Sequence, residues 1–350
     1  MCGRAVGYRF RYEKHFLGGD NTLNLAIVRV PLAVLLCFVA QSFSIADDAP
    51  AGAKVKKVLF IGIDGCRFDA IEAAETPQLD KLIAEGAHSA EVKILAPRET
   101  NSDTISGPGW SSLLTGVWSD KHGVVDNDFR QPKLDKFPHF FARLKAVQPK
   151  AQTVSLVDWL PLYRYIVSAA DVSQVYPPTD DCQLGDGLAA RVAVEILSKQ
   201  DPTAMFVYFG QVDEIGHRHG FHPTIATYTT AIERVDAYIG TLLAAMRSRE
   251  TYAQEDWLVL VSSDHGGKDK GHGGGHSEPE ITNSFVIVSG SAAERGKLTG
   301  PTYLVDVPVT ALTHLGVAID PGWQLDGRAI GLRPTKGIEQ KDTEKTETKK

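Results

Sequence analysis

The sequence predicts an α/β protein, a three-layer sandwich in which helices flank a mostly parallel central sheet. Short, almost continuously apolar runs alternate along the chain with longer segments of helical pattern. Apolar runs without polar alternation are typical of strands that are covered on both faces. The alternation of such strands with helices indicates a parallel sheet between two helix layers. The composition agrees, because 43% hydrophobic and 23% charged residues are ordinary values for a globular domain.

The individual elements follow from the same pattern. Strands are expected at residues 58–63, 153–157, 204–209, 257–262 and 284–288. Thr76 and Pro77 begin a helix as its cap and first residue, and Gly86 ends it. Further helices are expected at residues 140–147, 188–199, 225–246 and 307–315. The loops at 98–109, 126–136 and 266–283 are polar and rich in Gly or Pro, so they are the segments left to carry function.

The N-terminal segment has the features of a secretory signal. Arg29 precedes a short apolar run at residues 30–40, and Ser44 and Ala46 form a small-x-small cleavage site. The apolar run is too short to predict a membrane span. We therefore expect residues 1–46 to be a signal peptide or leader and the protein to be exported, either to the periplasm or out of the cell. The alternative is a protein that remains anchored by an uncleaved N-terminal segment.

The rest of the chain is expected to form one domain. Residues 47–55 would be a linker, 56–333 the catalytic domain and 334–350 a disordered charged tail. After signal removal only Cys66 and Cys182 remain, which is too few for a disulfide framework, and Cys66 is expected to be a buried small side chain. The formal net charge of -6 does not favour structural binding to nucleic acid.

Carboxylates follow the predicted strands where a ligand site would form. Asp64 comes directly after the run at 58–63, and Asp264 with His265 follows the run at 257–262. Asp213 and His217 are four residues apart, so on a helix both would face the same side. Ligands of open α/β sheets collect beyond the carboxyl ends of the strands. We therefore expect these residues to form one site.

A hydroxyl group and further histidines complete the candidate site. Ser106 precedes a helical stretch at residues 111–115, where helix amides would stabilise an anion, although Ser102 and Thr104 are alternative hydroxyls. His272 lies between glycines and is favoured over His276 as a ligand. Imidazole together with carboxylate favours zinc or a similar first-row divalent ion. Two such ions with a hydroxyl nucleophile predict a hydrolytic centre for phosphoryl or related transfer.

These segments, taken in order, resemble the alkaline phosphatase superfamily, and in particular its type I phosphodiesterase/nucleotide pyrophosphatase group. The resemblance extends from about residue 56 to residue 332. Its motifs are Ile63-Asp64-Gly65, Ser106-Gly107-Pro108 through Gly116, Lys121-His122-Gly123 through Asn127, Asp213 through His217, Ser263-Asp264-His265-Gly266, Gly271-His272-Gly273 and Leu325-Asp326-Gly327. The fold implied by the resemblance is the alkaline phosphatase-like sandwich.

The resemblance also implies roles for single residues. Asn127 would donate to a non-bridging phosphate oxygen, and Ser106 would attack phosphorus, with a water molecule then releasing the covalent intermediate. The two zinc ions would be held by Asp64, Ser106, Asp264 and His265 on one side and by Asp213, His217 and His272 on the other. Trp110 departs from the more usual polar residue near the nucleophile, which leaves the substrate contacts open.

The predicted function is therefore the hydrolysis of a small phosphorylated substrate, such as a nucleotide, by a zinc phosphodiesterase or nucleotide pyrophosphatase. The alternative within the same fold is a phosphomonoesterase or a hydrolase of phosphonate or sulfate esters. The sulfatase pattern of Cys or Ser followed by Pro and Arg is absent around Ser106. A monoesterase would use a cation for the extra phosphate charge, and Arg67 or Lys121 could supply it. A third hypothesis is a non-catalytic binding or surface protein that retains the site as a relic.

Overall fold

The computed structural model describes residues 54–176 and 182–334, and the side chain of Cys182 lies outside what it describes. The predicted signal peptide, most of the predicted linker and nearly all of the predicted tail also lie outside the described residues. Within the described residues no helix combines the length and the apolar character needed to cross a bilayer.

The centre of the fold is one mixed β-sheet with the strand order β4-β3-β5-β1-β6-β7-β2-β8, in which β9 also pairs with β2. Strands β4, β3, β5, β1 and β6 run parallel to one another, whereas β7 runs antiparallel to both β6 and β2. The strands are β1 Val55–Ile63, β2 Ala87–Lys93, β3 Thr153–Val157, β4 Val172–Val175, β5 Ala204–Phe209, β6 Glu255–Ser262, β7 Asn283–Gly290, β8 Gly296–Lys297 and β9 Thr302–Tyr303.

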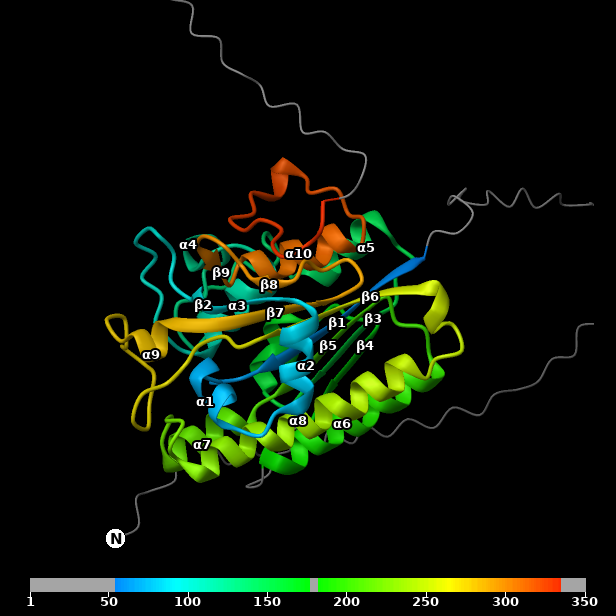
Figure 1. The fold of residues 1–350 in the computed structure, drawn as a ribbon. Helices are drawn as coiled ribbons and strands as arrows, with labels where there is room; N and C mark the ends of the chain where they lie inside the picture. Colours follow the sequence, from blue (N-terminus) through cyan, green and yellow to red (C-terminus); the bar gives the residue numbers. More distant parts are fainter. Residues whose placement is uncertain (1–53, 177–181, 335–350) are drawn as a thin grey trace, which may run out of the picture. The chain divides into compact units, whose positions relative to one another are not determined.

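Helices cover both faces of the sheet (Figure 1). One layer contains α1 Phe68–Ala73, α2 Pro77–Glu85, α6 Cys182–Lys199, α7 Gln211–His219 and α8 Ala226–Arg247, and the other contains α3 Ser106–Thr115, α4 Ser119–His122, α5 Phe140–Val147 and α10 Asp306–His314. The short helix α9 Pro279–Thr282 precedes β7. A π-helical turn lies at Leu162–Ile166 and 3-10 turns lie at Tyr252–Gln254 and Pro321–Trp323.

Strand β1 shows how one apolar run serves two cores. Leu59 and Ile61 belong to the core beneath α6 and α8, whereas Val58 and Phe60 belong to the core beneath α3, α5 and α10. All four side chains are fully buried. Because alternate side chains of a strand point to opposite faces, a strand between two helix layers has no polar face. This explains the continuous apolar runs in the sequence and confirms the predicted fold class.

The bounds of several elements differ from the prediction. Strands β3 and β5 have the predicted bounds, whereas β1, β6 and β7 are longer than predicted. Helix α3 begins at Ser106, five residues before the apolar stretch at 111–115 that indicated a helix in the sequence. Pro108 is tolerated in the first turn, where a helix needs no donor from it. The prediction also missed six residues at the start of α6, which contain two glycines.

Four strands were not predicted at all. Strand β2 contains polar and charged side chains and is only half-buried, so it lacks a continuous apolar run. Strand β4 is short and sits at the edge of the sheet, and β8 and β9 have two residues each. Short strands and edge strands form without a continuous apolar run, so they leave little hydrophobic pattern in the sequence. The buried parallel strands, which the sequence does reveal, are the ones that position the site.

Candidate metal centre

The site lies where three adjacent parallel strands end. Strands β5, β1 and β6 are neighbours in the sheet and end at Phe209, Ile63 and Ser262. Asp64 follows β1 directly, and Asp264 follows β6 by two residues. Asp213 lies in the first turn of α7, which starts two residues after β5. The carboxyl edge of the sheet therefore brings together three aspartates that are far apart in the sequence.

Asp64 is buried and held on one of its two oxygens. Its Oδ2 accepts hydrogen bonds from the hydroxyl of Tyr208 at 2.6 Å and from Nε1 of Trp110 at 2.9 Å. Burial, together with the Asp213 carboxylate, raises the pKa of Asp64 to about 7. The two donors fix the orientation of the carboxyl group, so that Oδ1 points toward Ser106 and His265.

Asp264 and His265 are fully buried beside Asp64. Oδ1 of Asp264 accepts from the backbone N–H of Gly65 at 3.3 Å, whereas its Oδ2 has no hydrogen-bond partner and lies 3.2 Å from His265 Nε2. Burial and the nearby carboxylates of Asp64 and Asp213 raise the pKa of Asp264 well above its ordinary value. A buried carboxylate oxygen without a donor is costly unless a cation compensates it.

Each of the three histidines at the site is anchored through Nδ1 to a backbone carbonyl. His265 contacts the carbonyl of Gly266 at 2.8 Å, His217 that of Lys270 at 3.0 Å, and His272 that of Thr104 at 3.0 Å. A carbonyl oxygen can only accept, so Nδ1 carries a proton, and each ring in its neutral form presents the Nε2 lone pair. Histidine ligands of metals are oriented in this way in proteins.

Asp213 lies between two of these rings. Its Oδ2 is 3.3 Å from His217 Nε2, and its Oδ1 is 3.4 Å from His272 Nε2. The two Nε2 atoms are 3.0 Å apart. Burial opposes ionisation of Asp213, but contacts with both rings outweigh it and lower its pKa. The contact with Asp213 also raises the pKa of His217 to about 9, so a proton holds this pair together where no metal competes.

The donor atoms form two overlapping groups. In one group Asp64, Asp264 and His265 each offer an atom within 4.8 Å of the others, and in the second group Asp213, His265 and His272 do the same. Burial lowers the pKa of His265 to about 3, so this ring is neutral and available as a ligand. The three carboxylates of these groups repel one another or must take up protons unless cations lie among them and the two imidazoles. The residues therefore fit divalent metal ions.

Ser106 is the hydroxyl residue that the structure brings to this cluster. Its Oγ lies 3.3 Å from His265 Nε2 and 3.5 Å from Asp64 Oδ1, at the first residue of α3. The two alternatives are occupied elsewhere: Ser102 donates to the carbonyl of Asp103, and Thr104 donates to the carbonyl of His272 at 2.5 Å. Thr104 therefore supports His272 rather than facing the cluster.

A pocket of about 230 Å³ opens onto the cluster. Asn127 lines it, and the side-chain oxygen of Asn127 accepts from the backbone N–H of Gly107 at 2.6 Å. The described residues that line the pocket include no Lys or Arg; they are Asp64, Ser106, Asn127, Asp158, Trp159, Tyr208, Gly210, Asp213, Glu214, His217 and His272.

Several residues singled out from the sequence lie away from the pocket. His276 is exposed, and its Nε2 contacts the carbonyl of Ser102 at 2.7 Å, so the structure does not bring it to the cluster. Arg67 is bound to Asp69 and to two backbone carbonyls, and Lys121 is bound to Asp326 and the carbonyl of Gln324. His122 is buried between Ser112 and the backbone of Val124, where it fixes a loop.

Other residues of the site were missed from the sequence. Tyr208 is the penultimate residue of β5 and donates to Asp64, but it looks like any aromatic residue of a buried strand. Trp110 is fully buried and supports Asp64, so it does not contact a substrate. Asp158 directly follows β3 and would have been found by the strand-end rule that identified Asp64. Cys66 is buried and unpaired, as its place after a strand predicted.

Known proteins match more than half of this chain. A sequence profile described as type I phosphodiesterase / nucleotide pyrophosphatase matches residues 58–273. Ectonucleotide pyrophosphatase/phosphodiesterase family member 7 of Mus musculus is 24% identical over 257 residues, which are 67% of this chain and 55% of that protein. The chain spans about half the length of the curated relatives it matches first.

Solved structures share the fold at low sequence identity. Murine ectonucleotide pyrophosphatase/phosphodiesterase 5, an inactive variant in complex with AMP, has a TM-score of 0.56 and 17% identity, and the match covers 76% of this chain and 96% of that chain. The phosphonate monoester hydrolase SpPMH from Silicibacter pomeroyi has a TM-score of 0.59 and 16% identity, covering 80% of this chain and 78% of that chain. At these identities the similarity concerns the fold.

Proposed function

Because the chain belongs to the type I phosphodiesterase/nucleotide pyrophosphatase family, we propose that it hydrolyses phosphoric diesters with Ser106 as nucleophile and two zinc ions as cofactors. One observation carries the proposal. Ser106 Oγ lies within 3.5 Å of both His265 Nε2 and Asp64 Oδ1, beside buried carboxylate oxygens that have no donor. A nucleophile and its metal ligands are thus assembled from separate segments at one edge of the sheet.

The donor set fits two zinc ions, because imidazole and carboxylate together are preferred by zinc over magnesium or calcium. We assign one ion to Asp64, Ser106, Asp264 and His265 and the other to Asp213, His217 and His272. His265 lies within reach of both groups of donors. When bound, the ions supply positive charge that favours the deprotonated serine and polarises the phosphate oxygens.

Ser106 is placed to attack phosphorus. As the first residue of the ten-residue helix α3, it lies at the positive end of the helix dipole, which stabilises negative charge on Oγ. The bond from Oγ to phosphorus forms while the bond from phosphorus to the ester oxygen breaks, and the departing oxygen takes up a proton. Water then cleaves the phosphoserine ester and restores the hydroxyl of Ser106.

Asn127 is held ready to bind the phosphate. Its side-chain oxygen is bound to the backbone of Gly107, the residue that follows the nucleophile. Its amide NH₂ therefore remains free to donate into the pocket that both residues border. A non-bridging phosphate oxygen gains negative charge during attack, so this donor would stabilise the transition state more than the bound substrate.

The charge of the pocket favours a diester over a monoester. A diester phosphate carries one negative charge, whereas a monoester carries up to two and benefits from an additional cation. No described Lys or Arg lines the pocket, and Asp158 and Glu214 add carboxyl groups to its wall. Arg67 and Lys121, which could have supplied the cation, are bound elsewhere. This arrangement supports the phosphodiesterase assignment over the phosphomonoesterase alternative.

The pocket also offers an aromatic surface. Trp159 lines it, and Phe129 packs behind Trp159 at a ring distance of 6.3 Å. A flat base or aryl group attached to the phosphate would bury apolar area against such a ring. The murine relative described above is in complex with AMP. We therefore propose a nucleotide-containing diester or pyrophosphate as substrate class.

The test is a comparison of rates on two chromogenic substrates that differ in one ester bond. Zinc-loaded protein should hydrolyse bis(p-nitrophenyl) phosphate with a kcat/KM at least tenfold above that for p-nitrophenyl phosphate, with about two equivalents of zinc per chain measured by mass spectrometry. A faster rate on the monoester would refute the diester assignment. Less than one equivalent of tightly held metal would refute the two-metal centre.

We also propose that the domain is exported and that residues 56–333 form its catalytic unit. The apolar run at 30–40 and the small residues Ser44 and Ala46 support a cleaved signal, with an uncleaved anchor as the alternative. N-terminal sequencing of the protein recovered from the periplasm or medium decides between them. A chain that begins at Asp47 supports cleavage, and a membrane-bound chain that retains residue 30 supports the anchor.

A further inference from the structure

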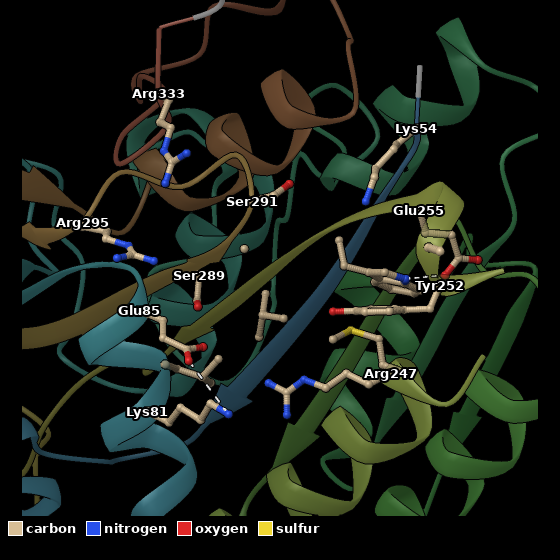
Figure 2. A pocket seen from close by; sticks show the side chains of 16 residues that line it. Lys54, Lys81, Glu85, Arg247, Tyr252, Glu255, Ser289, Ser291, Arg295 and Arg333 are labelled. Atoms are coloured by element: carbon tan, nitrogen blue, oxygen red, sulfur yellow. Dashed lines mark hydrogen bonds and ion pairs between the residues drawn. The ribbon is translucent and has the colours of Figure 1, made fainter. Parts of the chain in front are cut away.

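A second hollow lies at the opposite edge of the sheet from the metal centre. It has a volume of about 400 Å³, within the range of small-molecule sites. Its walls come from the residue before β1, from α2, from the C-terminal end of α8 and from the segments that flank β6 and β7 (Figure 2). Lys54 lies ten residues before Asp64, so about 30 Å of extended strand separates this hollow from the metal centre.

Five cationic side chains surround the hollow: Lys54, Lys81, Arg247, Arg295 and Arg333. Figure 2 shows that their charged ends turn toward the same space, although they come from five separate segments of the chain. The two carboxylates in the lining are Glu85 and Glu255. Cations thus outnumber carboxylates in a protein whose formal net charge is -6.

The two carboxylates do not neutralise this charge. Glu255 is buried and bound to Arg249, Thr251 and Trp257, and its pKa is lowered, since these hydrogen bonds outweigh burial. Glu85 lies 3.9 Å from Lys81 in an exposed pair, which is a weak interaction. Among the described residues, Lys54, Arg247, Arg295 and Arg333 have no ion pair with a carboxylate.

Several cations elsewhere in the described chain form ion pairs. Arg249 binds Asp201 and Glu255, Lys145 binds Asp171, and Arg98 binds Asp120 and Asp326. Like charges that face one space repel one another, and an anion in that space relieves the repulsion. Four of the five cations around the hollow have no carboxylate partner among the described residues, so the hollow offers a place for an external anion.

The floor of the hollow is apolar. Leu82, Met246 and Trp257 are buried beneath the cationic rim, and the side chains of Tyr252 and Ser289 add hydroxyl groups to the wall. From the rim and the floor together, we propose that this hollow binds a small molecule that carries two or more phosphate groups on a compact body. Several guanidinium groups match several phosphate groups, because each forms paired hydrogen bonds with phosphate oxygens.

Two other occupants fit less well. The chain's own C-terminal residues 335–350 contain five lysines and four acidic residues, so they bring no net negative charge to neutralise the rim. An anionic bilayer presents a flat surface, whereas the cations here turn inward around a cavity. A soluble, multiply phosphorylated molecule satisfies both the charge and the shape. The proposal concerns a separate site and stands whether or not the chain hydrolyses diesters.

The test uses a probe that is a weak metal ligand and cannot be hydrolysed. Pyrenetetrasulfonate is titrated into the full-length, zinc-loaded protein and followed by fluorescence anisotropy. Binding should be saturable, should weaken as salt rises, and should be reversed by fructose bisphosphate at lower concentration than by inorganic phosphate. The double variant Arg247→Glu/Arg295→Glu should weaken probe binding at least tenfold; both side chains are exposed, so the fold should persist.

A charge-matched control distinguishes binding in the hollow from nonspecific attraction of the anionic probe to the whole protein. Arg191→Glu/Lys150→Glu changes the net charge equally, at exposed positions that do not line the hollow, and should leave probe affinity within twofold. An equal loss in both double variants, or no loss in Arg247→Glu/Arg295→Glu, would overturn the proposal. The proposal would also be overturned if the protein co-sedimented with phosphatidylserine vesicles while fructose bisphosphate failed to displace the probe.

Discussion

The two edges of the sheet carry opposite charge in opposite surroundings. At the carboxyl edge, Asp64 and Asp264 are 2% and 0% exposed, and each oxygen has either a protein donor or an imidazole beside it. At the other edge, Arg247 and Arg295 are exposed and have no carboxylate partner among the described residues. Buried charge must be compensated within the fold or by a tightly held ion, whereas exposed charge is solvated by water until a ligand binds.

This difference predicts where a substitution abolishes function and where it only changes binding. At the carboxyl edge, the loss of a single atom should lower metal affinity or activity, because each group there is fixed by its neighbours. The cationic hollow should respond to net charge, since its side chains are long, exposed and independent.

The largest expected effect is at the nucleophile. Ser106→Ala removes the oxygen that would bond to phosphorus, so kcat on bis(p-nitrophenyl) phosphate should fall by about 10³-fold or more. Zinc content should remain above one equivalent per chain, because the other assigned ligands are intact. Ser102→Ala is the matched control, since that hydroxyl contacts only the carbonyl of Asp103, and its rate should be unchanged. Full activity of Ser106→Ala would remove the assigned nucleophile.

Zinc affinity should depend on pH with a defined sign. The contact with Asp213 raises the pKa of His217 to about 9, so below that pH an incoming ion must displace a proton. Apparent affinity should therefore rise at least about tenfold per pH unit between about pH 7 and 9. Below about pH 7 the rise should be steeper, because burial raises the pKa of Asp64 to about 7. Competition with a chromogenic chelator measures this, and a pH-independent affinity would contradict the ligand assignment.

A smaller effect is expected from Tyr208, which acts through Asp64. Tyr208→Phe removes the donor at 2.6 Å from Oδ2 of Asp64 and leaves only Trp110 to orient the carboxylate. Loss of such a supporting donor lowers metal affinity or activity by about tenfold to a hundredfold. Tyr165→Phe provides the control, because that exposed side chain stacks on Phe129 and does not line the pocket. Equal zinc affinity and kcat/KM in both variants would show that Tyr208 only fills the core.

How far the sequence predicts this molecule depends on burial. Strands β3 and β5 have the predicted bounds, because both are buried along their whole length and carry no charged residue. Strand β2 was not predicted, because it is partly exposed and polar residues such as His88 and Lys93 interrupt its apolar pattern. Asp64 and Asp264 were found by their place after buried strands, and the family resemblance inferred from their motifs is confirmed.

The supporting residues could not be predicted in the same way. Tyr208 and Trp110 lie in apolar segments where an aromatic residue needs no special reason, and only their contacts with Asp64 distinguish them. The cationic hollow was also missed, because its rim comes from five segments between Lys54 and Arg333 that form no motif. Clusters assembled by the fold from long, exposed side chains leave no periodic signal in a single sequence.

The smallest expected effect completes the comparison. Arg247→Glu/Arg295→Glu should leave kcat/KM on bis(p-nitrophenyl) phosphate within twofold of the unmodified protein at physiological salt. Strand β1 keeps the two edges about 30 Å apart, several Debye lengths, so a charge at one edge is screened from the other. At low salt the same variant should slow hydrolysis slightly, because two positive charges are replaced by two negative ones and the more negative protein repels an anionic substrate at long range. A tenfold loss at physiological salt would show that the cationic hollow and the metal centre are coupled through the fold and are not independent sites.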